Sequence, residues 1–107
     1  MNRCKYIISL IGLLPSSVLA GSGLGTASNV AVQNNGVALF SINGTRTGAP
    51  SCATTNRFAF AANTSAGQNM LATLLTGYGL GRSISVFGDG TCTTWPDSEN
   101  VTYLVTP

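Results

Sequence analysis

Residues 57–87 read RFAFAANTSAGQNMLATLLTGYGLGRSISVF, and within them the apolar pattern changes its period twice. The first part, 57–61, alternates Phe with Ala, which predicts a strand with one apolar face. From residue 65 the apolar residues recur instead at helical spacing, on a stripe of Met70, Leu71, Leu74, Leu75 and Tyr78. The period returns to two over 83–87, with Ile84 and Val86 predicted to point inward. The stretch therefore predicts a strand, a helix and a second strand in succession.

The ends of this helix carry recognisable signals. Ser65 with Gln68 three residues later predicts a capping box, and Thr64 is the alternative N-cap. Three closely spaced glycines predict its end: Gly77, Gly79 and Gly81. The other face of the helix is polar but uncharged, and it consists of Gln68, Asn69, Thr73 and Thr76. Such a face suits contact with copies of itself or a narrow channel, although an exposed face of a charge-poor protein is the alternative.

Further strands are predicted on both sides of this stretch. Residues 29–33 and 37–42 flank an Asn34-Asn35-Gly36 turn, and 101–105 alternate again. Nearly every position of 37–42 is apolar, so we expect it to be covered on both faces. The order of three strands, a helix and two strands indicates a mainly β (α+β) protein with an OB-like five-stranded barrel. We expect one domain over 28–107, a flexible arm at 21–27 and a long loop at 43–50.

The first 20 residues have the composition of a secretory signal peptide. A basic start is followed by a short apolar run, Pro15 and the small-residue end Val18-Leu19-Ala20. The apolar run is shorter than the about 20 residues of a membrane span. A membrane anchor or an amphipathic helix is the alternative. We predict cleavage after Ala20, export to the periplasm or the medium, and no membrane insertion.

Export makes a disulfide the simplest state for the two remaining cysteines, Cys52 and Cys92. The bond would close a loop of about 40 residues, worth about 4 kcal/mol in the chain-entropy model. Two free thiols, or half of a metal site, are the alternatives. The other ligands for a metal site are missing from the sequence pattern, so we expect no metal and no cofactor.

Charge and composition exclude several classes of function. Histidine is absent, which rules out a His general base, a Ser-His-Asp triad and His metal ligands. After residue 20, three arginines balance three acids, so the domain lacks the basic surface of a nucleic-acid-binding protein. About a third of residues 21–107 are Ser, Thr or Asn. Such side chains suit neutral hydrogen-bonding ligands, including sugars, and they are also common on exported β-proteins.

The sequence favours a protein that is not an enzyme. Asp97 and Glu99 are the only closely spaced carboxylates, and two carboxylates can serve a glycosidase or contribute to a Ca²⁺ site. In a short loop they are better explained as solvated or paired with arginine. Arg46 and Arg57 lie near the third predicted strand, where each can meet a carboxylate.

A connected pattern of short motifs resembles a known family. It comprises Cys52-Ala53, 57–60, 65–67, 70–75, 81–86 and Gly90-Thr91-Cys92. This pattern resembles the B subunits of subtilase-cytotoxin and pertussis-like AB5 toxins, and still more their small exported bacterial relatives, over about residues 28–105. The resemblance implies an OB-like fold, a ring of five copies with helices around a pore, sugar sites on the outer strands and an exported A subunit as partner. The family's key serine corresponds to Ser28, with Thr26 as the other candidate.

Two functions from different classes follow. The first is a glycan-binding module, with Ser28, Thr26 and Trp95 as candidate contacts, since a tryptophan in a loop can stack on a sugar ring. Packing of Trp95 on the disulfide or at the barrel end is the alternative for that residue. The second function is a structural or interaction protein of the periplasm or cell surface that uses the same fold without sugar. In either case the uncharged helix face predicts a homo-oligomer, and the resemblance points to a pentamer.

Overall fold

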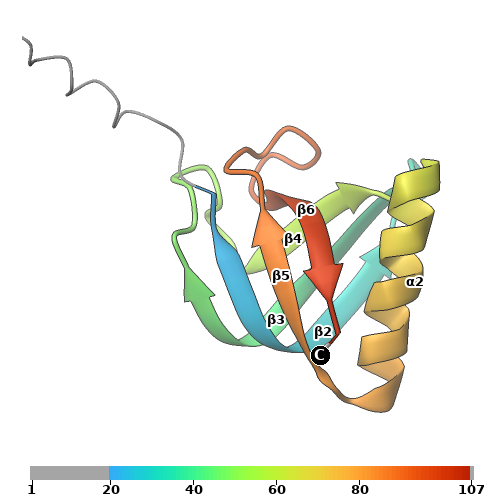
Figure 1. Ribbon diagram of the computed structural model, residues 1–107. Coiled ribbons are helices and arrows are strands. Elements are labelled where there is room, and N and C mark those ends of the chain that lie inside the picture. Colours follow the sequence, from blue (N-terminus) through green and yellow to red (C-terminus); the bar gives the residue numbers. More distant parts are fainter. Residues whose placement is uncertain (1–19, 107) are drawn as a thin grey trace, which may run out of the picture.

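The computed structural model describes residues 20–106, which form a five-stranded barrel with one helix (Figure 1). The elements are, in chain order, β2 (Ser22–Val32), β3 (Val37–Thr47), β4 (Arg57–Ala61), α2 (Ser65–Leu80), β5 (Ser83–Gly88) and β6 (Glu99–Val105). The predicted order of three strands, a helix and two strands is confirmed. Residues 1–19, which hold most of the predicted signal peptide, lie outside the described residues.

Strand pairing closes the sheet in the order β2-β3-β4-β6-β5, and β5 pairs back onto β2. The contact between β4 and β6 is parallel and the other contacts are antiparallel. The β2–β3 hairpin turns at residues 34–36 as predicted, and Gly36 adopts a positive φ of 89° there. A helix between the third and fourth strands of such a barrel is the OB-like arrangement expected from the sequence.

The barrel interior is filled by apolar side chains from all five strands. Phe40 of β3 stacks on Phe58 of β4 with ring centroids 5.8 Å apart, and it meets Phe60 edge-on at 6.2 Å. Ile84 and Val86 of β5 are fully buried in the same cluster. The alternation in the sequence predicts that Ile84 and Val86 point inward, and that prediction is confirmed.

The helix α2 packs beside the barrel against β2, β5 and β6 (Figure 1). It begins after Thr64, whose hydroxyl accepts a hydrogen bond from the Gly67 amide at 2.9 Å, so Thr64 rather than Ser65 is the N-cap. It ends at Gly81 in the left-handed conformation, as predicted. Within residues 20–106, no helix has the length and apolar character that a membrane span requires.

The buried side of α2 depends on a glycine that was expected to help end the helix. Gly77 lies inside α2 and is buried, like Leu74 one turn earlier. A Cβ on Gly77 would stand 2.6 Å from the side chain of Ile84, so a larger residue would push the helix away from β5. Leu75 and Tyr78, predicted on the buried stripe, are instead 46% and 48% exposed. The buried side of the helix thus runs along Gly67, Leu74 and Gly77, and Leu75 and Tyr78 face solvent.

A second, smaller apolar cluster lies on the outside of the barrel. Val37 and Leu39 of β3 and Ala59 of β4 form it, and Trp95 packs over it. Trp95 belongs to the loop between β5 and β6, in which the Ser98 amide donates to the Trp95 carbonyl at 3.1 Å. The loop thus covers the outer face of β3 and β4, which confirms that this part of β3 is buried on both faces.

Two stretches expected to be irregular are strands in the structure. The expected arm at 21–27 is wrong, because Ser22 to Thr26 pair with both β3 and β5. The loop expected at 43–50 is also wrong for its first half, since β3 continues to Thr47. Both stretches are rich in Gly, Ser, Thr and Asn. Their backbones form strand pairs without a run of apolar side chains, so hydrophobic periodicity could not predict these strands. The first strand of the domain therefore begins at residue 22 rather than 28.

Candidate functional site

A shallow hollow of about 310 Å³ lies on the outer face of β2, β3 and β5. The strand register makes its side chains direct neighbours: Ser22 lies between Thr47 and Phe87, and Leu24 lies between Thr45 and Ser85. Gly23 completes the lining. On β2, Ser22 and Leu24 point outward and Gly23 between them faces the barrel interior. The side chains that line the hollow are therefore the outward-pointing residues of the three strands.

An aromatic pair borders the hollow on the β5 side. Phe87 stacks on Tyr103 of β6, with ring centroids 4.5 Å apart and an angle of 16° between the ring planes. Tyr103 is 50% exposed, and Leu24 across the hollow is 52% exposed. These side chains belong to neither of the two buried clusters. They form an apolar border next to four hydroxyl groups of serine and threonine.

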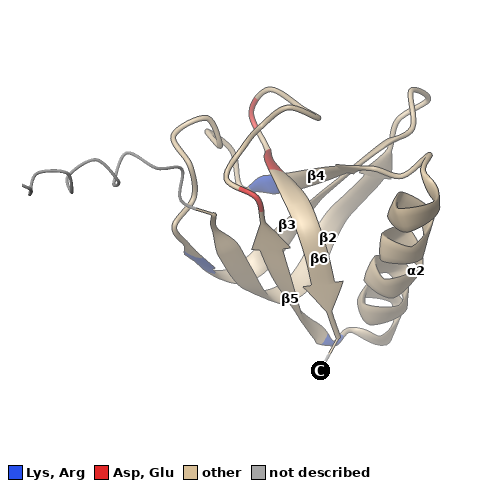
Figure 2. Cartoon of the chain, turned by 45° about the horizontal axis from the view of Figure 1, so that its top comes forward, with Lys and Arg blue, Asp and Glu red and all other residues tan. Residues whose placement is uncertain are grey.

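The electrostatic character of this face is neutral. All seven residues that line the hollow are uncharged. Figure 2 shows charged segments gathered at the loop end of the barrel, one more beside the C-terminal end, and none along α2. A ligand at the hollow is therefore met by hydroxyls, backbone groups and aromatic rings rather than by an ion pair.

The predicted glycan-contacting residues of β2 lie next to the hollow but do not line it. Thr26 is two residues beyond Leu24, and it pairs with Asn43 and Ser83 on the neighbouring strands. The Ser28 hydroxyl donates to the Asn43 side-chain oxygen at 3.3 Å. Thr26 and Ser28 thus share one strand and one outer surface, which continues from the hollow along β2.

Trp95, the third predicted glycan contact, lies elsewhere. It is half-buried over Val37, Leu39 and Ala59 on the β3–β4 side. This agrees with the alternative that Trp95 packs against the protein, although its partner is the outer apolar cluster rather than the disulfide or the barrel end. The structure therefore does not bring Trp95 together with Thr26 and Ser28.

The aromatic pair was not among the residues expected at the site, but a signal for it exists in the sequence. Ile84 and Val86 were assigned inward, which places Phe87 outward by alternation. Tyr103 shares the odd-numbered positions of β6 with Val101, which is buried in the barrel, whereas 103 and 105 are exposed. A register shift in the β5–β6 pairing lies between Tyr103 and Val101, and alternation does not predict it. The outward position of Phe87 was therefore predictable, but the position of Tyr103 and its contact with Phe87 were not.

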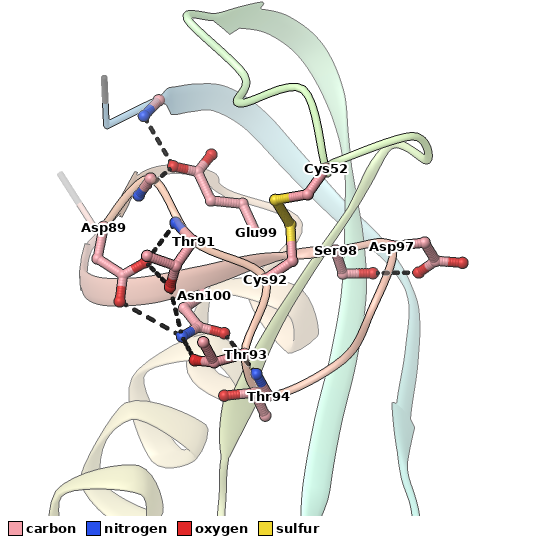
Figure 3. Close-up of a disulfide and its surroundings, with 12 residues drawn as sticks. Cys52, Asp89, Thr91, Cys92, Thr93, Thr94, Asp97, Ser98, Glu99 and Asn100 are labelled. Carbon is pink, nitrogen blue, oxygen red and sulfur yellow. Dashed lines mark hydrogen bonds between the residues drawn. A yellow bond between two sulfur atoms is a disulfide. The ribbon is translucent and has the colours of Figure 1, made fainter. Parts of the chain in front are cut away.

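The predicted disulfide is present at the loop end of the barrel. Cys52 and Cys92 are bonded, with Cα atoms 6.1 Å apart, and they join the loop after β3 to the loop after β5 (Figure 3). Asp97 in the second loop forms an ion pair with Arg57 at 2.9 Å. A hydrogen bond from the Ser98 hydroxyl and the nearby Arg57 guanidinium hold the pKa of Asp97 below its ordinary value.

Glu99, two residues further, is fully buried where β6 begins. One carboxylate oxygen accepts hydrogen bonds from the amides of Gly21 at 2.8 Å and Gly90 at 2.9 Å (Figure 3). The other oxygen pairs with Arg46 at 3.2 Å, and the Arg46 guanidinium lies 4.0 Å from the centroid of the Phe58 ring. Of the two alternatives, pairing with arginine is thus confirmed for both carboxylates, and Glu99 is buried rather than solvated.

The two carboxylates at 97 and 99 have different partners and do not share a site. Within residues 20–106, no three Cys, Asp or Glu side chains are grouped where they could hold a metal ion. Comparison with protein-family models, with curated proteins and with solved structures finds no match. The resemblance to the toxin B subunits therefore rests on the sequence pattern alone.

Proposed function

We propose that this protein is an exported, disulfide-bonded binding module that holds a neutral glycan of a cell surface in the hollow on β2, β3 and β5. The observation that carries the proposal is the Phe87–Tyr103 stack, in which Phe87 is half-buried and Tyr103 exposed, beside the row of serine and threonine hydroxyls. A sugar ring presents hydroxyls at its edge and C–H groups on its faces. The hollow offers a partner for each kind of group, because it combines hydrogen-bonding side chains with an aromatic surface.

The hollow lies on a part of the barrel that the Trp95 loop leaves open, and this is not the face that OB-folds commonly use. OB-folds commonly bind oligonucleotides and oligosaccharides on the face of their second and third strands. In this protein those strands are β3 and β4, and the Trp95 loop covers their outer face. The neutral surface also favours a sugar over a nucleic acid, because nucleic-acid affinity depends on phosphate contacts from Lys and Arg. The open face is the one on β2 and β5.

A glycan array on the chain that begins at Gly21 tests this proposal. A bound glycan is then titrated by calorimetry against Tyr103→Ala, for which we expect an affinity loss on the order of tenfold, since each 1.4 kcal/mol changes Kd tenfold. Ser51→Ala is the control, because Ser51 is an exposed loop residue outside both the hollow and the helix. A chain that binds no glycan, or Tyr103→Ala binding as tightly as Ser51→Ala, contradicts the proposal.

A second candidate function, assembly without sugar, is favoured by the exposed side of α2. The helix carries no charge, and Leu75, Tyr78 and Leu80 are 46%, 48% and 68% exposed. The strands leave little room for edge-to-edge pairing with another copy, because the sheet is closed. We therefore place self-association on the helix, and we propose a closed ring, five copies by the toxin resemblance, with α2 toward the axis.

Sedimentation at micromolar concentration measures this assembly. We expect a species near five times the monomer mass, and Thr73→Glu should shift it to the monomer because five added charges would face one another across the axis. Glu placed at Ser51, an exposed loop position, is the control substitution. A monomer in all three chains removes the ring. A ring that binds no glycan makes the structural or interaction protein the better account.

A further inference from the structure

The backbone nitrogen of Gly21 is held by a buried carboxylate. Gly21 is itself buried, and its N–H donates to the Glu99 side chain at 2.8 Å. The residue before it, Ala20, is exposed. The Gly21 carbonyl accepts from the Gly88 amide at 2.8 Å, so residue 21 is fixed at both its nitrogen and its oxygen. The chain thus changes from exposed to buried at the bond between residues 20 and 21.

Only glycine fits at this position. A Cβ on residue 21 would stand 2.6 Å from the Glu99 carboxylate, 2.9 Å from the Gly48 carbonyl oxygen and 3.0 Å from that of Thr47. A side chain at residue 21 would therefore meet the Glu99 carboxylate and two backbone carbonyl oxygens. An ordinary peptide nitrogen has one N–H to donate, and Glu99 already accepts it.

We propose that Glu99 is a binding site for the free amino group that forms when the chain is cut between Ala20 and Gly21. The cut consumes one water molecule: its oxygen joins the Ala20 carbonyl carbon as a carboxylate, and the Gly21 nitrogen becomes an amine that takes up a proton. The peptidase that removes signal peptides supplies the catalysis. The new ammonium then pairs with the Glu99 carboxylate inside the barrel end, in place of a neutral amide.

The charges around this pair are those of Arg46 and Asp89. Arg46 binds the other oxygen of Glu99, so the oxygen next to Gly21 is shared only with the Gly90 amide. Asp89 lies beside Gly90, and its carboxylate accepts from the Thr91 amide and hydroxyl and from the Asn100 side chain. A carboxylate in contact favours the charged form of an amine, so the pKa of the Gly21 amino group should lie above the ordinary value of about 7.7–8.0.

The composition makes this amine easy to follow. Lys5 is the only lysine of the sequence, so the chain that begins at Gly21 has one primary amine, its own N-terminus. A water-soluble amine-acylating reagent therefore adds a single group, which intact mass measures directly. The test compares the chain that begins at Gly21 with the chain that begins at Ala20, and with Glu99→Gln and Asp89→Asn in the Gly21 chain.

At neutral pH we expect the amine of the Gly21 chain to be acylated at least tenfold more slowly than that of the Ala20 chain, whose amine is moved outward by one residue. The pH midpoint of labelling should lie above 8 in the Gly21 chain and in Asp89→Asn, and it should fall in Glu99→Gln. Equal labelling rates in the Gly21 and Ala20 chains overturn the proposal. So does a labelling midpoint that is unchanged in a folded Glu99→Gln, and so does a protein recovered from the periplasm with another first residue.

Stability gives a second readout that keeps Glu99 intact, because Glu99→Gln can fail to fold. An acetyl group on Gly21 keeps the N–H donor but removes the charge, so it separates the ion pair from the hydrogen bond. The stabilisation by the ammonium is present in full below its unfolded pKa of about 7.7–8.0, and it is lost as the pH rises through the raised folded pKa. The free chain should thus melt several degrees above the acetylated one at pH 7 and together with it near pH 11. Equal melting temperatures at pH 7 overturn the proposal.

None of these measurements depends on glycan binding, so they test the amine site separately from the proposed function.

Discussion

The two outer faces of this barrel have similar residues and opposite surroundings. On β3 and β4, outward Val37, Leu39 and Ala59 are covered by Trp95. On β5 and β6, outward Phe87 and Tyr103 stack only on each other, and Tyr103 stays half exposed. One face is closed by a loop of the same chain, and the other is left open.

The difference shows what a loop and a disulfide do for a small barrel. The loop that carries Trp95 is bonded through Cys92 to Cys52, so it is anchored where it crosses the β3–β4 side. Within the described residues 20–106, no loop covers the β2–β5 side in this way. There β5, which follows the helix α2, pairs with β2 and closes the barrel. Apolar surface that the fold does not cover itself is available to a ligand.

The largest effect is expected from removing the anchor of the covered face. Replacing Cys52 and Cys92 with Ser should lower the free energy of unfolding by about 4 kcal/mol, because the unfolded chain regains the freedom of a loop of about 40 residues. Urea unfolding followed by fluorescence of Trp95, the only tryptophan, measures this. The reduced wild-type chain is the control and should match the double variant. A loss of less than 1 kcal/mol in both contradicts the role given to the bond.

A smaller pair of effects should separate the two faces directly. Trp95→Ala is expected to cost about 2 kcal/mol of stability, below the cost of a fully buried tryptophan because Trp95 is half-buried. Tyr103→Ala should cost about 1 kcal/mol, the value of an aromatic pair. Glycan affinity should change in the reverse order, with a loss only for Tyr103→Ala. Equal effects of both substitutions on stability and on binding would remove the distinction between the faces.

The smallest effect concerns the pH dependence of the loop on the covered face. Since the pKa of Asp97 is lowered in the folded protein, its stabilisation is present above the ordinary value of 3.8 and is lost as the pH falls through the lowered pKa. Melting temperatures between pH 2 and 6 should show the wild type losing its small advantage over Asp97→Asn at the acidic end. Ser98→Ala, which removes the largest cause of the shift, should reduce that advantage. An advantage that grows toward low pH contradicts the assignment.

The sequence predicted the elements whose period is carried by large side chains. β4 was predicted at its observed bounds, and Ile84 and Val86 of β5 were correctly predicted to point inward, because Phe, Ile and Val alternate with small residues there. The predictions failed where backbone contacts replaced side-chain contacts. Glycines at 23 and 25 pair within β2 without any apolar signal, and Gly77 sets the helix against β5 because it has no side chain.

For the candidate site, the sequence predicted only the strand that carries it and the chemical class of its ligand. Ser28 and Thr26 placed it on β2, and the hydroxyl-rich composition indicated a neutral ligand. Phe87 and Tyr103 were missed because strands β5 and β6 are separated by a loop of ten residues, 89–98, and alternation alone does not reveal that they pair. The position of Trp95 depends likewise on how that loop crosses the barrel.

The pairing of β2 with β5 also determines when this protein can acquire its shape. Residues 22–26 must meet residues 83–87, about 60 positions later, and contacts between such distant segments form slowly. A chain that crosses a membrane with its N-terminus first cannot complete this seam until nearly all of it has emerged. For the proposed export, the polypeptide would then stay unfolded during its passage. The β2–β5 pairing, the Cys52–Cys92 bond and the surface formed by β2, β3 and β5 would form only on the far side of the membrane.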